Sequence, residues 1–266
     1  MSETANSLLA ADEPPAVTVV NEGGRSPFLI VADHAGKTIP RRLKQLGLAA
    51  ADRDRHIAWD IGIGAVCEWM GKALDAVVIK QNYSRLVIDS NRTPGSEASI
   101  LDMSETTAVP GNLGLSDDDR RVRVGEIFLP YHNRITRELD RRRDTRRPTA
   151  LISMHSFTPV FKSEARPWHT GVLYQRDPRF AHILMELLAR EQGLVIGDNE
   201  PYSVTDASDY TIPIHGEQRG LHHVALEIRQ DLIAEDAGQR WWAALFARLL
   251  PQAYASLDRQ PKFRES

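Results

Sequence analysis

Residues 28–36 read FLIVADHAG, an apolar run that stops abruptly at Asp33 and His34. A short apolar run bounded by polar and glycine residues is typical of a β-strand followed by a loop. Similar runs predict further strands at residues 17–20, 76–80, 86–89, 150–154, 172–174, 194–196 and 224–228. Helices are predicted from about residue 60 to 74, from 116 to 143 with a kink at Pro130, from 179 to 191, and from 236 to about 257.

The order of these elements indicates the fold class. Strands alternate with helices, which favours an α/β fold whose mostly parallel sheet is covered on both faces. No repeat or linker divides the chain, so we expect residues 17–266 to form one domain. Residues 1–16 are mostly small or polar, and we expect a flexible N-terminal arm there. Residues 93–115 have little regular pattern, and loops of that length are often lids over a binding site.

The composition excludes several classes of protein. Of the 266 residues, 42% are hydrophobic and 26% are charged, which suffices for a folded core. The net charge of −3 gives no bulk electrostatic reason to bind nucleic acid or a membrane surface. Cys67 is the single cysteine, which excludes an internal disulfide framework and fits a reducing cytoplasm. The apolar runs are too short to span a bilayer, so we expect a cytoplasmic protein.

Polar side chains collect where the predicted strands end, and binding sites in open α/β sheets form at the carboxyl ends of strands. His34 and His155 each follow such a run, and Asp60 lies at a predicted helix start. Two imidazoles and a carboxylate are the ligands that hydrolytic zinc prefers. For each histidine alone, a hydrogen-bonded structural role is the alternative. No local motif such as HExxH selects among the nine histidines of the chain.

Arginines and a glutamate at the same strand ends have two interpretations each. Arg85, Arg92 and Arg229 suit bidentate capture of a substrate carboxylate, or they pair with nearby structural acids. Glu227 lies within the apolar run 224–228, where burial should raise its pKa and suit it to act as a general base. The alternative is that Glu227 neutralises a buried arginine.

Several other features are interpreted as structural. Gly62 and Gly64 resemble part of a dinucleotide-binding loop, but Cys67 stands where the third glycine belongs, and Cys67 is interpreted as a packed helix residue. Ser156 is not expected to be a nucleophile, because no Gly-x-Ser-x-Gly motif surrounds it. The basic run at residues 141–147 is predicted to be a solvated helix end rather than a nucleic-acid site.

Five short segments form a larger pattern in order along the chain. They are residues 33–36 (DHAG) with Ile39 and Pro40, residues 56–62 (HIAWDIG), residues 84–89 (SRLVID) with Asn91 and Arg92, residues 155–157 (HSF), and residues 226–232 (LEIRQDL). Together they resemble the N-formylglutamate amidohydrolase family. The resemblance implies a three-layer α/β/α domain with a mixed, mostly parallel sheet of the phosphorylase/hydrolase type, as in the zinc carboxypeptidases and aspartoacylase.

The resemblance also implies an activity, which is metal-dependent hydrolysis of the C–N bond in an N-acylated acidic amino acid. The typical substrate is N-formyl-L-glutamate, which yields formate and glutamate and belongs to histidine degradation. By position, His34 and His155 resemble the histidine ligands of a zinc ion, although another divalent metal is an alternative. Arg85 resembles the arginine that polarises the substrate carbonyl, and Glu227 resembles the general base.

The same resemblance implies residues that bind the substrate. Asn91 and Arg92 resemble the pair that holds the substrate carboxylate. Ser156 and Arg229 are expected to contribute further contacts, and His215 is expected near the leaving group. We therefore expect a small-molecule substrate as the partner, with no nucleic acid and no membrane, while the oligomeric state stays open.

One position departs from the family pattern. Carboxypeptidase-like sites place a glutamate three residues after the first histidine, and here that position is Lys37. We therefore expect Asp60 to supply the carboxylate ligand, with Asp33 as the second choice. The alternatives are a zinc carboxypeptidase, a deacylase for another acyl group, or a carboxylate-binding protein that has lost the metal.

Overall fold

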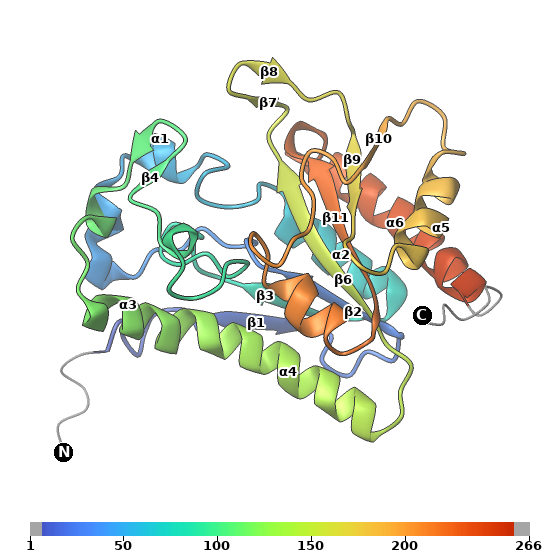
Figure 1. Ribbon diagram of the computed structural model, residues 1–266, viewed down its shortest axis with the longest axis horizontal. Helices are drawn as coiled ribbons and strands as arrows, with labels where there is room; N and C mark the ends of the chain where they lie inside the picture. The colour runs from blue at the N-terminus through green and yellow to red at the C-terminus, as the bar shows by residue number, and fades with distance from the viewer. Residues whose placement is uncertain (1–6, 258–266) are drawn as a thin grey trace.

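A seven-stranded sheet forms the centre of the protein (Figure 1). The structure is a computed structural model that describes residues 7–257. The strands lie in the order β1-β3-β2-β6-β11-β9-β10. Their bounds are β1 Val17–Val20, β2 Phe28–Ala32, β3 Val77–Gln81, β6 Ala150–Phe157, β9 Thr170–Leu173, β10 Ile196–Asp198 and β11 His222–Arg229.

Most neighbouring strands in this sheet are parallel. Strands β3, β2, β6 and β11 run in one direction, and β10 runs parallel to β9. The antiparallel pairs are β1 with β3 and β9 with β11. The predicted α/β class with a mixed, mostly parallel sheet is therefore confirmed. Because β2, β6 and β11 run the same way, their carboxyl ends meet at one edge of the sheet.

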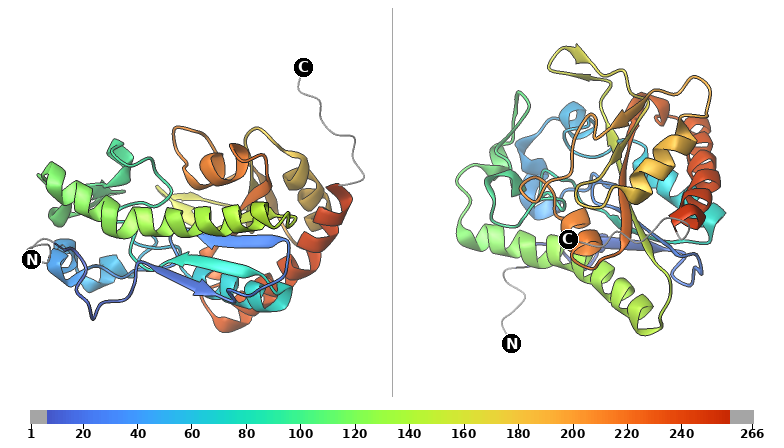
Figure 2. Two further views of the ribbon diagram at one scale, coloured as in Figure 1. Left: turned by 90° about the horizontal axis from the view of Figure 1, so that it is seen from below. Right: turned by 45° about the vertical axis from the view of Figure 1, so that its right-hand side comes forward.

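Helices cover both faces of the sheet. The four main helices are α2 Ile63–Leu74, α4 Leu129–Asp144, α5 Arg179–Leu188 and α6 Asp236–Leu257. Strand β2 is buried throughout, so Phe28 and Ile30 pack with α2, α5 and α6, whereas Leu29 and Val31 pack with α4. Figure 2 shows α4 on one side of the sheet and α2 and α6 on the other. The three-layer architecture is therefore confirmed. No helix within residues 7–257 has the length and apolar character needed to cross a membrane.

Short elements fill the connections. They are η2 Arg41–Gly47, α1 Ala50–Arg53, η3 Glu97–Ser99, β4 Met103–Ser104, β5 Thr107–Ala108, η4 Pro110–Asn112, α3 Asp117–Arg123, η5 Val124–Phe128, β7 Val160–Phe161, β8 Glu164–Ala165, η6 Ile212–Glu217 and η7 Gln230–Leu232. The segment 93–115 thus contains short helical turns and the hairpin β4–β5. This hairpin and the hairpin β7–β8 extend from the body of the protein in Figure 1.

The helix predicted over residues 116–143 is divided into parts. Ser116 caps α3 by accepting a hydrogen bond from the Asp119 amide, while the Asp119 carboxylate accepts one from the Ser116 amide. The π-helical turn η5 then leads into α4, which carries Pro130 in its first turn. Proline has no N–H to continue a helical ladder but is tolerated at a helix start, so the interruption falls just before it.

Residues 86–89, which we predicted as a strand, form a turn and a loop instead. Leu86, Val87 and Ile88 are buried in an apolar cluster around Tyr83. Their apolar character therefore reflects burial of the turn and not a place in the sheet, because tertiary burial outweighs intrinsic β-propensity. Strands β9 and β10 lie within two residues of their predicted bounds.

The expected N-terminal arm is only partly within the described residues. Residues 1–6 lie outside them. The remainder of the arm packs against the domain: Leu8 is buried, its amide donates a hydrogen bond to the Glu126 carboxylate, and the Tyr83 hydroxyl donates one to the Pro14 carbonyl. Residues 7–16 thus contact the core, since Leu8 belongs to an apolar cluster there, and the flexibility of the arm stays a prediction.

Gly62 and Cys67 have structural roles at the start of α2. The backbone of Gly62 has a φ of 80°, and a Cβ atom there would lie 2.1 Å from the carbonyl oxygen of Ile233. Glycine is therefore required at this position. Cys67 is fully buried in the core, and burial raises the pKa of its thiol to about 12. This placement agrees with a packed helix residue and not with a reactive thiolate.

The basic run at residues 141–147 ends α4 and is mostly exposed, as predicted, but Arg142 is an exception. Arg142 is 0% exposed and pairs at 2.8 Å with Glu138, which is also buried. Its guanidinium also donates hydrogen bonds to the carbonyls of Ser26, Pro27 and Phe28 at the start of β2. Arg143, by contrast, is exposed. Arg142 therefore fastens the end of α4 to the start of β2.

Replacement of this buried arginine should destabilise the protein. Arg142→Met removes the buried donor that joins the Glu138 carboxylate to the carbonyls at the start of β2, so we expect a loss of about 3 kcal/mol in the free energy of unfolding. Arg143→Met is the matched control and should change it by less than about 0.5 kcal/mol. Urea denaturation of both variants measures the difference, and equal stabilities would contradict the role given to Arg142.

Candidate active site

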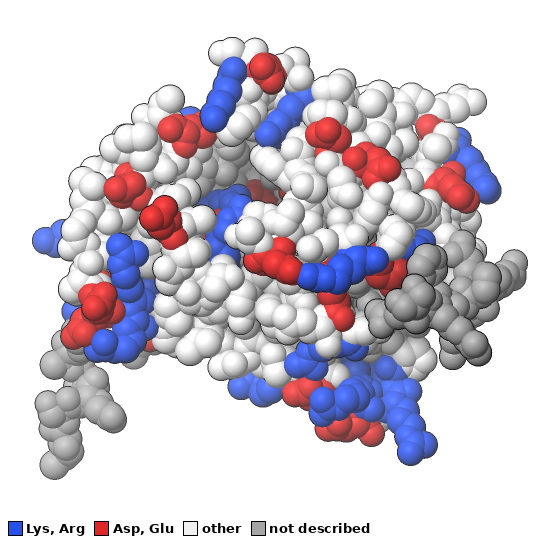
Figure 3. Space-filling view, viewed as in Figure 1, with Lys and Arg blue, Asp and Glu red and all other residues white. Residues whose placement is uncertain are grey.

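A cavity of about 570 Å³ lies at the carboxyl ends of β2, β6 and β11. Figure 3 shows the molecule hollowed at this point, with basic and acidic side chains in the depth of the hollow. Eight residues predicted from the sequence line the cavity: His34, Asp60, Arg85, Asn91, Arg92, His155, Ser156 and Glu227. The parallel strands thus bring together side chains that lie far apart in the chain.

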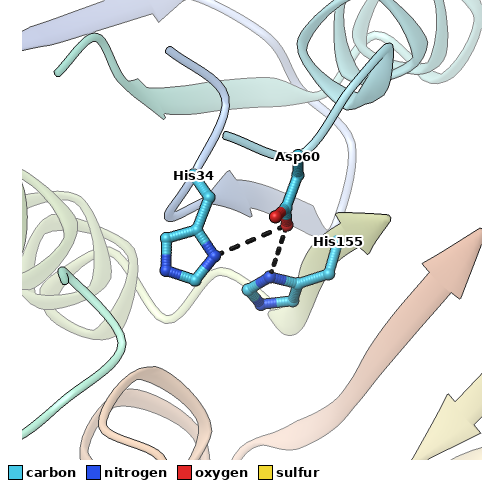
Figure 4. Close-up of side chains that lie close together, drawn as sticks. All are labelled: His34, Asp60 and His155. Carbon is cyan, nitrogen blue, oxygen red and sulfur yellow. Dashed lines mark hydrogen bonds and ion pairs between the residues drawn. The ribbon is translucent and has the colours of Figure 1, made fainter. Parts of the chain in front are cut away.

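His34, Asp60 and His155 form a buried cluster in this cavity (Figure 4). Asp60 Oδ2 is 3.4 Å from His34 Nδ1 and 3.0 Å from His155 Nδ1. One ligand atom from each of the three residues lies within 4.8 Å of the other two. Two imidazole nitrogens and a carboxylate oxygen are a common donor set of hydrolytic zinc sites. The arrangement therefore brings together three residues able to hold a metal ion.

Backbone contacts place Asp60 between the two histidines. The Asp60 amide donates a hydrogen bond of 2.9 Å to the carbonyl of His34, and the Ser156 amide lies 3.3 Å from Asp60 Oδ2. Asp60 stands in the loop before α2, whereas His34 follows β2 and His155 lies within β6. The loop is therefore fastened to both strands at the point where its carboxylate faces the two rings.

Two further groups of acids and hydroxyls orient the imidazole rings. His34 Nε2 donates a hydrogen bond of 2.7 Å to Asp89 Oδ1. His155 Nε2 faces Asp33 Oδ2 at 3.3 Å and Ser153 Oγ at 3.1 Å. Both rings therefore turn Nδ1 toward Asp60. Metal-binding histidines commonly have their second nitrogen held in this way, which sets the tautomer and the orientation of the ring.

The cluster concentrates negative charge in a buried volume. Asp33, Asp60 and Asp89 are 1%, 3% and 4% exposed. Burial raises the pKa of Asp33, but its hydrogen bond to His155 and nearby positive charge outweigh burial and lower the pKa to about 2. Burial lowers the pKa of His155, but Asp33 and Asp60 raise it well above its usual value. Buried anions need such compensation, which protonated imidazoles or a bound cation can supply.

A ring nitrogen that faces Asp60 at 3.4 Å but makes no hydrogen bond among the described residues suits coordination of a cation. His34 Nδ1 is buried and has no hydrogen-bond partner among residues 7–257. The other nitrogen of the ring is held by Asp89, so in the neutral ring the lone pair of Nδ1 faces the cluster. A buried polar atom without a partner costs about 1–3 kcal/mol. Coordination of a cation would remove that cost.

Arg85 lies beside the cluster and is held by a carboxylate. Its Nε and Nη2 donate hydrogen bonds of 3.1 and 2.7 Å to Asp89 Oδ2. Its Nη1 is 3.6 Å from Asp60 Oδ1. Asp89 thus orients Arg85 and His34 together. The two interpretations of Arg85 are therefore compatible, because a guanidinium fixed by one acid still lines the cavity with its remaining N–H groups.

Glu227 stands next to the cluster on β11, where the strand register pairs it with His155 of β6. The side chain is buried, and its Oε2 has no hydrogen-bond partner within the described part of the chain. Burial raises the pKa of Glu227 to about 7, although the positive charge of His155 opposes this effect. A carboxyl group that titrates near neutrality and lines a cavity can accept and return a proton.

Asn91 and Arg92 have different surroundings although they are neighbours. The Asn91 side chain donates to Asp209 Oδ1 at 2.8 Å and accepts from the amides of Tyr210 and Thr211. Arg92 donates to the carbonyl of Ser208, and no carboxylate within residues 7–257 lies at ion-pair distance from it. Arg92 is therefore a cation that lines the cavity without a direct ion pair among residues 7–257, whereas Asn91 holds the segment that forms the cavity wall.

Two of the predicted substrate-binding residues do not line the cavity. Arg229 pairs with Asp231 at 2.8 Å. His215 is buried behind the site, where its Nε2 lies 2.9 Å from Nδ1 of His132. Burial lowers the pKa of His215 to about 3, so its ring is neutral. The expected substrate contacts of Arg229 and His215 are therefore not available in this structure, because each side chain is engaged elsewhere.

The other predicted positions have local roles. Ser156 lines the cavity, and its hydroxyl donates a hydrogen bond of 3.0 Å to the Ile61 carbonyl. Asp33, the second choice for the carboxylate ligand, faces His155 Nε2 and accepts a hydrogen bond from Thr211. Lys37 is exposed and pairs with Asp54 outside the cavity. The residue that departs from the family pattern therefore takes no part in the site.

One part of the cavity was missed from the sequence. Residues 199–203, together with Ser208 and Asp209, line the cavity wall opposite the predicted clusters. This segment follows β10, which with β9 runs opposite to β2, β6 and β11, so the strand-end rule that selected the other residues does not point to it.

Comparisons with known proteins agree with the geometry. Residues 26–234 match the family described as N-formylglutamate amidohydrolase. The chain is 31% identical over 151 residues to the N-formylglutamate deformylase of Pseudomonas putida, a match that covers 50% of this chain and 52% of that protein. The chain thus spans about half the length of this curated relative.

Two solved structures are similar over most of their length. A gene product of Agrobacterium tumefaciens is 33% identical, with a TM-score of 0.91, and the match covers 94% of this chain and 99% of that one. An N-formylglutamate amidohydrolase from Ralstonia eutropha is 17% identical, with a TM-score of 0.65, and the match covers 93% of this chain and 100% of that one. At 17% identity, the similarity to the Ralstonia eutropha protein shows the fold alone.

Proposed function

The chain belongs to the N-formylglutamate amidohydrolase family, and on that premise we propose that it hydrolyses N-formyl-L-glutamate to formate and L-glutamate. The observation that carries the proposal is the buried cluster of His34, Asp60 and His155 beside Glu227 in one cavity. Such a cavity offers a place for a metal ion, a proton acceptor and cationic groups around one small anionic substrate. The cytoplasmic location of the protein and its place in histidine degradation stay predictions.

His34, Asp60 and His155 are the residues that would hold the metal, and zinc is the metal that suits them best. When bound, a zinc ion lowers the pKa of its water and polarises the substrate carbonyl. Asp89 and Asp33 keep the two imidazole rings in the orientation that this role requires. His34 Nδ1 supports the assignment, because it faces Asp60 Oδ2 at 3.4 Å without making a hydrogen bond among the described residues.

Glu227 acts as the general base in this proposal. Its carboxylate accepts a proton from the attacking water, and the carboxylic acid then returns that proton to the departing amine of glutamate. The C–N bond breaks as the acyl carbon gains the oxygen of the water, so formate and glutamate leave with their atoms balanced. The burial of Glu227 and the pKa of about 7 support this role, because both protonation states are accessible near neutral pH.

Two arginines supply positive charge at different points. Arg85 stabilises the oxyanion that develops at the acyl carbon, because it is held beside Asp60 with N–H groups lining the cavity. Arg92 binds a carboxylate of the substrate, because it lines the cavity without a direct ion pair among the described residues. Asn91 contributes by holding the segment around Tyr210 in place rather than by touching the substrate.

The first prediction of the proposed function concerns the substrate and the metal together. The protein, purified without added chelator, should hydrolyse N-formyl-L-glutamate, and removal of the metal by a chelator should abolish the activity until zinc is restored. Release of formate measures the reaction. Hydrolysis that survives complete metal removal would refute the metal site. Binding of the substrate without any turnover would favour a carboxylate-binding protein instead.

The second prediction concerns the ligands. His34→Ala and His155→Ala should each lose bound metal, because two remaining ligands hold zinc too weakly. His182→Ala is the control, since His182 is exposed and bonds only the Tyr174 hydroxyl among the described residues. Elemental analysis of the three purified variants gives the metal content. Full metal content in both ligand variants would overturn the assignment.

The third prediction concerns the proton acceptor. Glu227→Gln keeps the shape of the side chain but removes its ability to accept a proton, so kcat should fall by roughly 10² to 10⁴. The metal content of this variant should equal that of the unmodified protein, which separates loss of the base from loss of the metal. Turnover close to that of the unmodified protein would rule out the role of Glu227.

A further inference from the structure

The two imidazoles of the candidate metal site are each oriented by a different acid. His34 Nε2 is bonded to Asp89 Oδ1 at 2.7 Å, and His155 Nε2 faces Asp33 Oδ2 at 3.3 Å. Both acids are buried, and with the rings in these positions both Nδ1 atoms face Asp60 (Figure 4). The geometry of the cluster therefore depends on what fixes the two carboxylates.

The carboxylate of Asp33 is fixed through its Oδ1 atom. Oδ1 accepts a hydrogen bond of 2.7 Å from the Thr211 hydroxyl. Oδ2, the atom that faces His155, accepts no hydrogen bond among residues 7–257, and the nearby Tyr131 hydroxyl makes none within the same residues. Because a hydrogen bond to an ionised group is stronger than one between neutral groups, the bond from Thr211 sets the direction of the carboxylate.

The backbone of Thr211 is connected to the second acid through Asn91. The Thr211 amide donates a hydrogen bond of 3.0 Å to Asn91 Oδ1, and the Asn91 amide donates one of 2.8 Å to Asp89 Oδ1. Thr211 and Asn91 are both buried, and hydrogen bonds are stronger in the interior than in water. The two residues therefore connect the acid that orients one imidazole to the acid that orients the other.

Together with the cluster, these contacts close a ring. Asp60 Oδ2 lies 3.4 Å from Nδ1 of His34 and 3.0 Å from Nδ1 of His155. From there the ring of contacts passes through each imidazole to its acid, and Thr211 and Asn91 join the two acids. Loss of the contact between Thr211 and its acid should therefore loosen the orientation of one imidazole and leave the other in place.

We propose that Thr211 is a positioning residue of the metal site, whose hydroxyl fixes the Asp33 carboxylate and, through it, the ring of His155. This inference rests on the proposed function. Thr211 does not line the active-site cavity, so it acts through Asp33 and not by touching the substrate.

The first test removes the hydroxyl and keeps the backbone. Thr211→Val has nearly the same shape and retains the amide that donates to Asn91, so only the bond to Asp33 is lost. The zinc dissociation constant, measured by competition with a chromogenic chelator, should rise about tenfold, the lower end of the effect of losing a partner of a metal ligand. Thr211→Ser keeps the hydroxyl and should bind zinc as tightly as the unmodified protein.

Thr170→Val is the matched control for this test. Thr170 is as buried as Thr211, but its hydroxyl donates to the backbone carbonyl of Glu227 and not to an acid that orients an imidazole. The control therefore also loses one buried hydrogen bond, while its zinc dissociation constant should not change. Thermal melting shows whether each variant is folded, and Thr211→Ala replaces Thr211→Val if the latter is not.

The second test asks whether Thr211 acts through Asp33. Asp33→Asn removes the charge that faces His155 and should itself weaken zinc binding. If the hydroxyl acts through that carboxylate, adding Thr211→Val to Asp33→Asn should raise the dissociation constant by less than about threefold, because coupled residues have non-additive effects. A further tenfold rise in the double variant would overturn the proposed route through Asp33.

The outcomes separate this proposal from the proposed function. Zinc affinity of Thr211→Val equal to that of the unmodified protein would overturn the proposal, and so would equal weakening in Thr211→Ser. At saturating zinc, the KM of Thr211→Val for N-formyl-L-glutamate should stay unchanged, and a raised KM would place Thr211 in the substrate site instead. An unmodified protein that binds zinc without hydrolysing this substrate would refute the proposed function alone, whereas one that binds no zinc would refute both.

Discussion

Four carboxyl groups, those of Asp33, Asp60, Asp89 and Glu227, are buried side by side at one edge of a parallel sheet. Their mutual repulsion and their separation from water would destabilise the fold unless positive charge were placed among them. Arg85 and the two imidazoles provide that charge and are consequently held at short distances to the acids. Glu227 is the member without a direct ion pair among the described residues, and it is also the one whose pKa rises.

The sheet brings these groups together because of its strand directions. Strands β2, β6 and β11 are adjacent and parallel, so His34, His155 and Glu227 reach the same edge although they are remote in the chain. Gly171 on the neighbouring β9 lies opposite Glu227, and a Cβ atom there would lie 2.0 Å from the carbonyl oxygen of Glu200. The glycine therefore lets the segment after β10 approach closely enough to close the cavity wall.

The sequence predicted well what depends on local pattern. Apolar runs located all seven sheet strands to within a few residues, and the polar residues beside the predicted strand and helix ends include the eight that line the cavity. The predictions that were wrong have a common cause. Residues 86–89 and Arg142 were misjudged because their burial is decided by distant partners, the cluster around Tyr83 in one case and the start of β2 in the other.

The same limit explains the site residues that were misplaced. Arg229 and His215 have the residue types expected for a substrate site, but whether a side chain turns into a cavity depends on its three-dimensional neighbours. The segment 199–203 was overlooked because it carries no periodic pattern and becomes part of the site only through the closure of the wall. The family resemblance indicated the type of reaction and the candidate residues. The orientation of each side chain could be determined only from the three-dimensional structure.

Strand β2 has a further consequence for how this protein can vary. Its amino end is bonded through backbone carbonyls to Arg142, and His34, two residues past its carboxyl end, is bonded to Asp89. The length of the strand thus fixes the distance between two buried contacts, that of Arg142 at one end and that of His34 with Asp89 at the other. Insertion or deletion of a single residue between 28 and 33 would break one of these contacts or turn every side chain to the opposite layer. Length changes among relatives should therefore accumulate in the two hairpins and not in this strand.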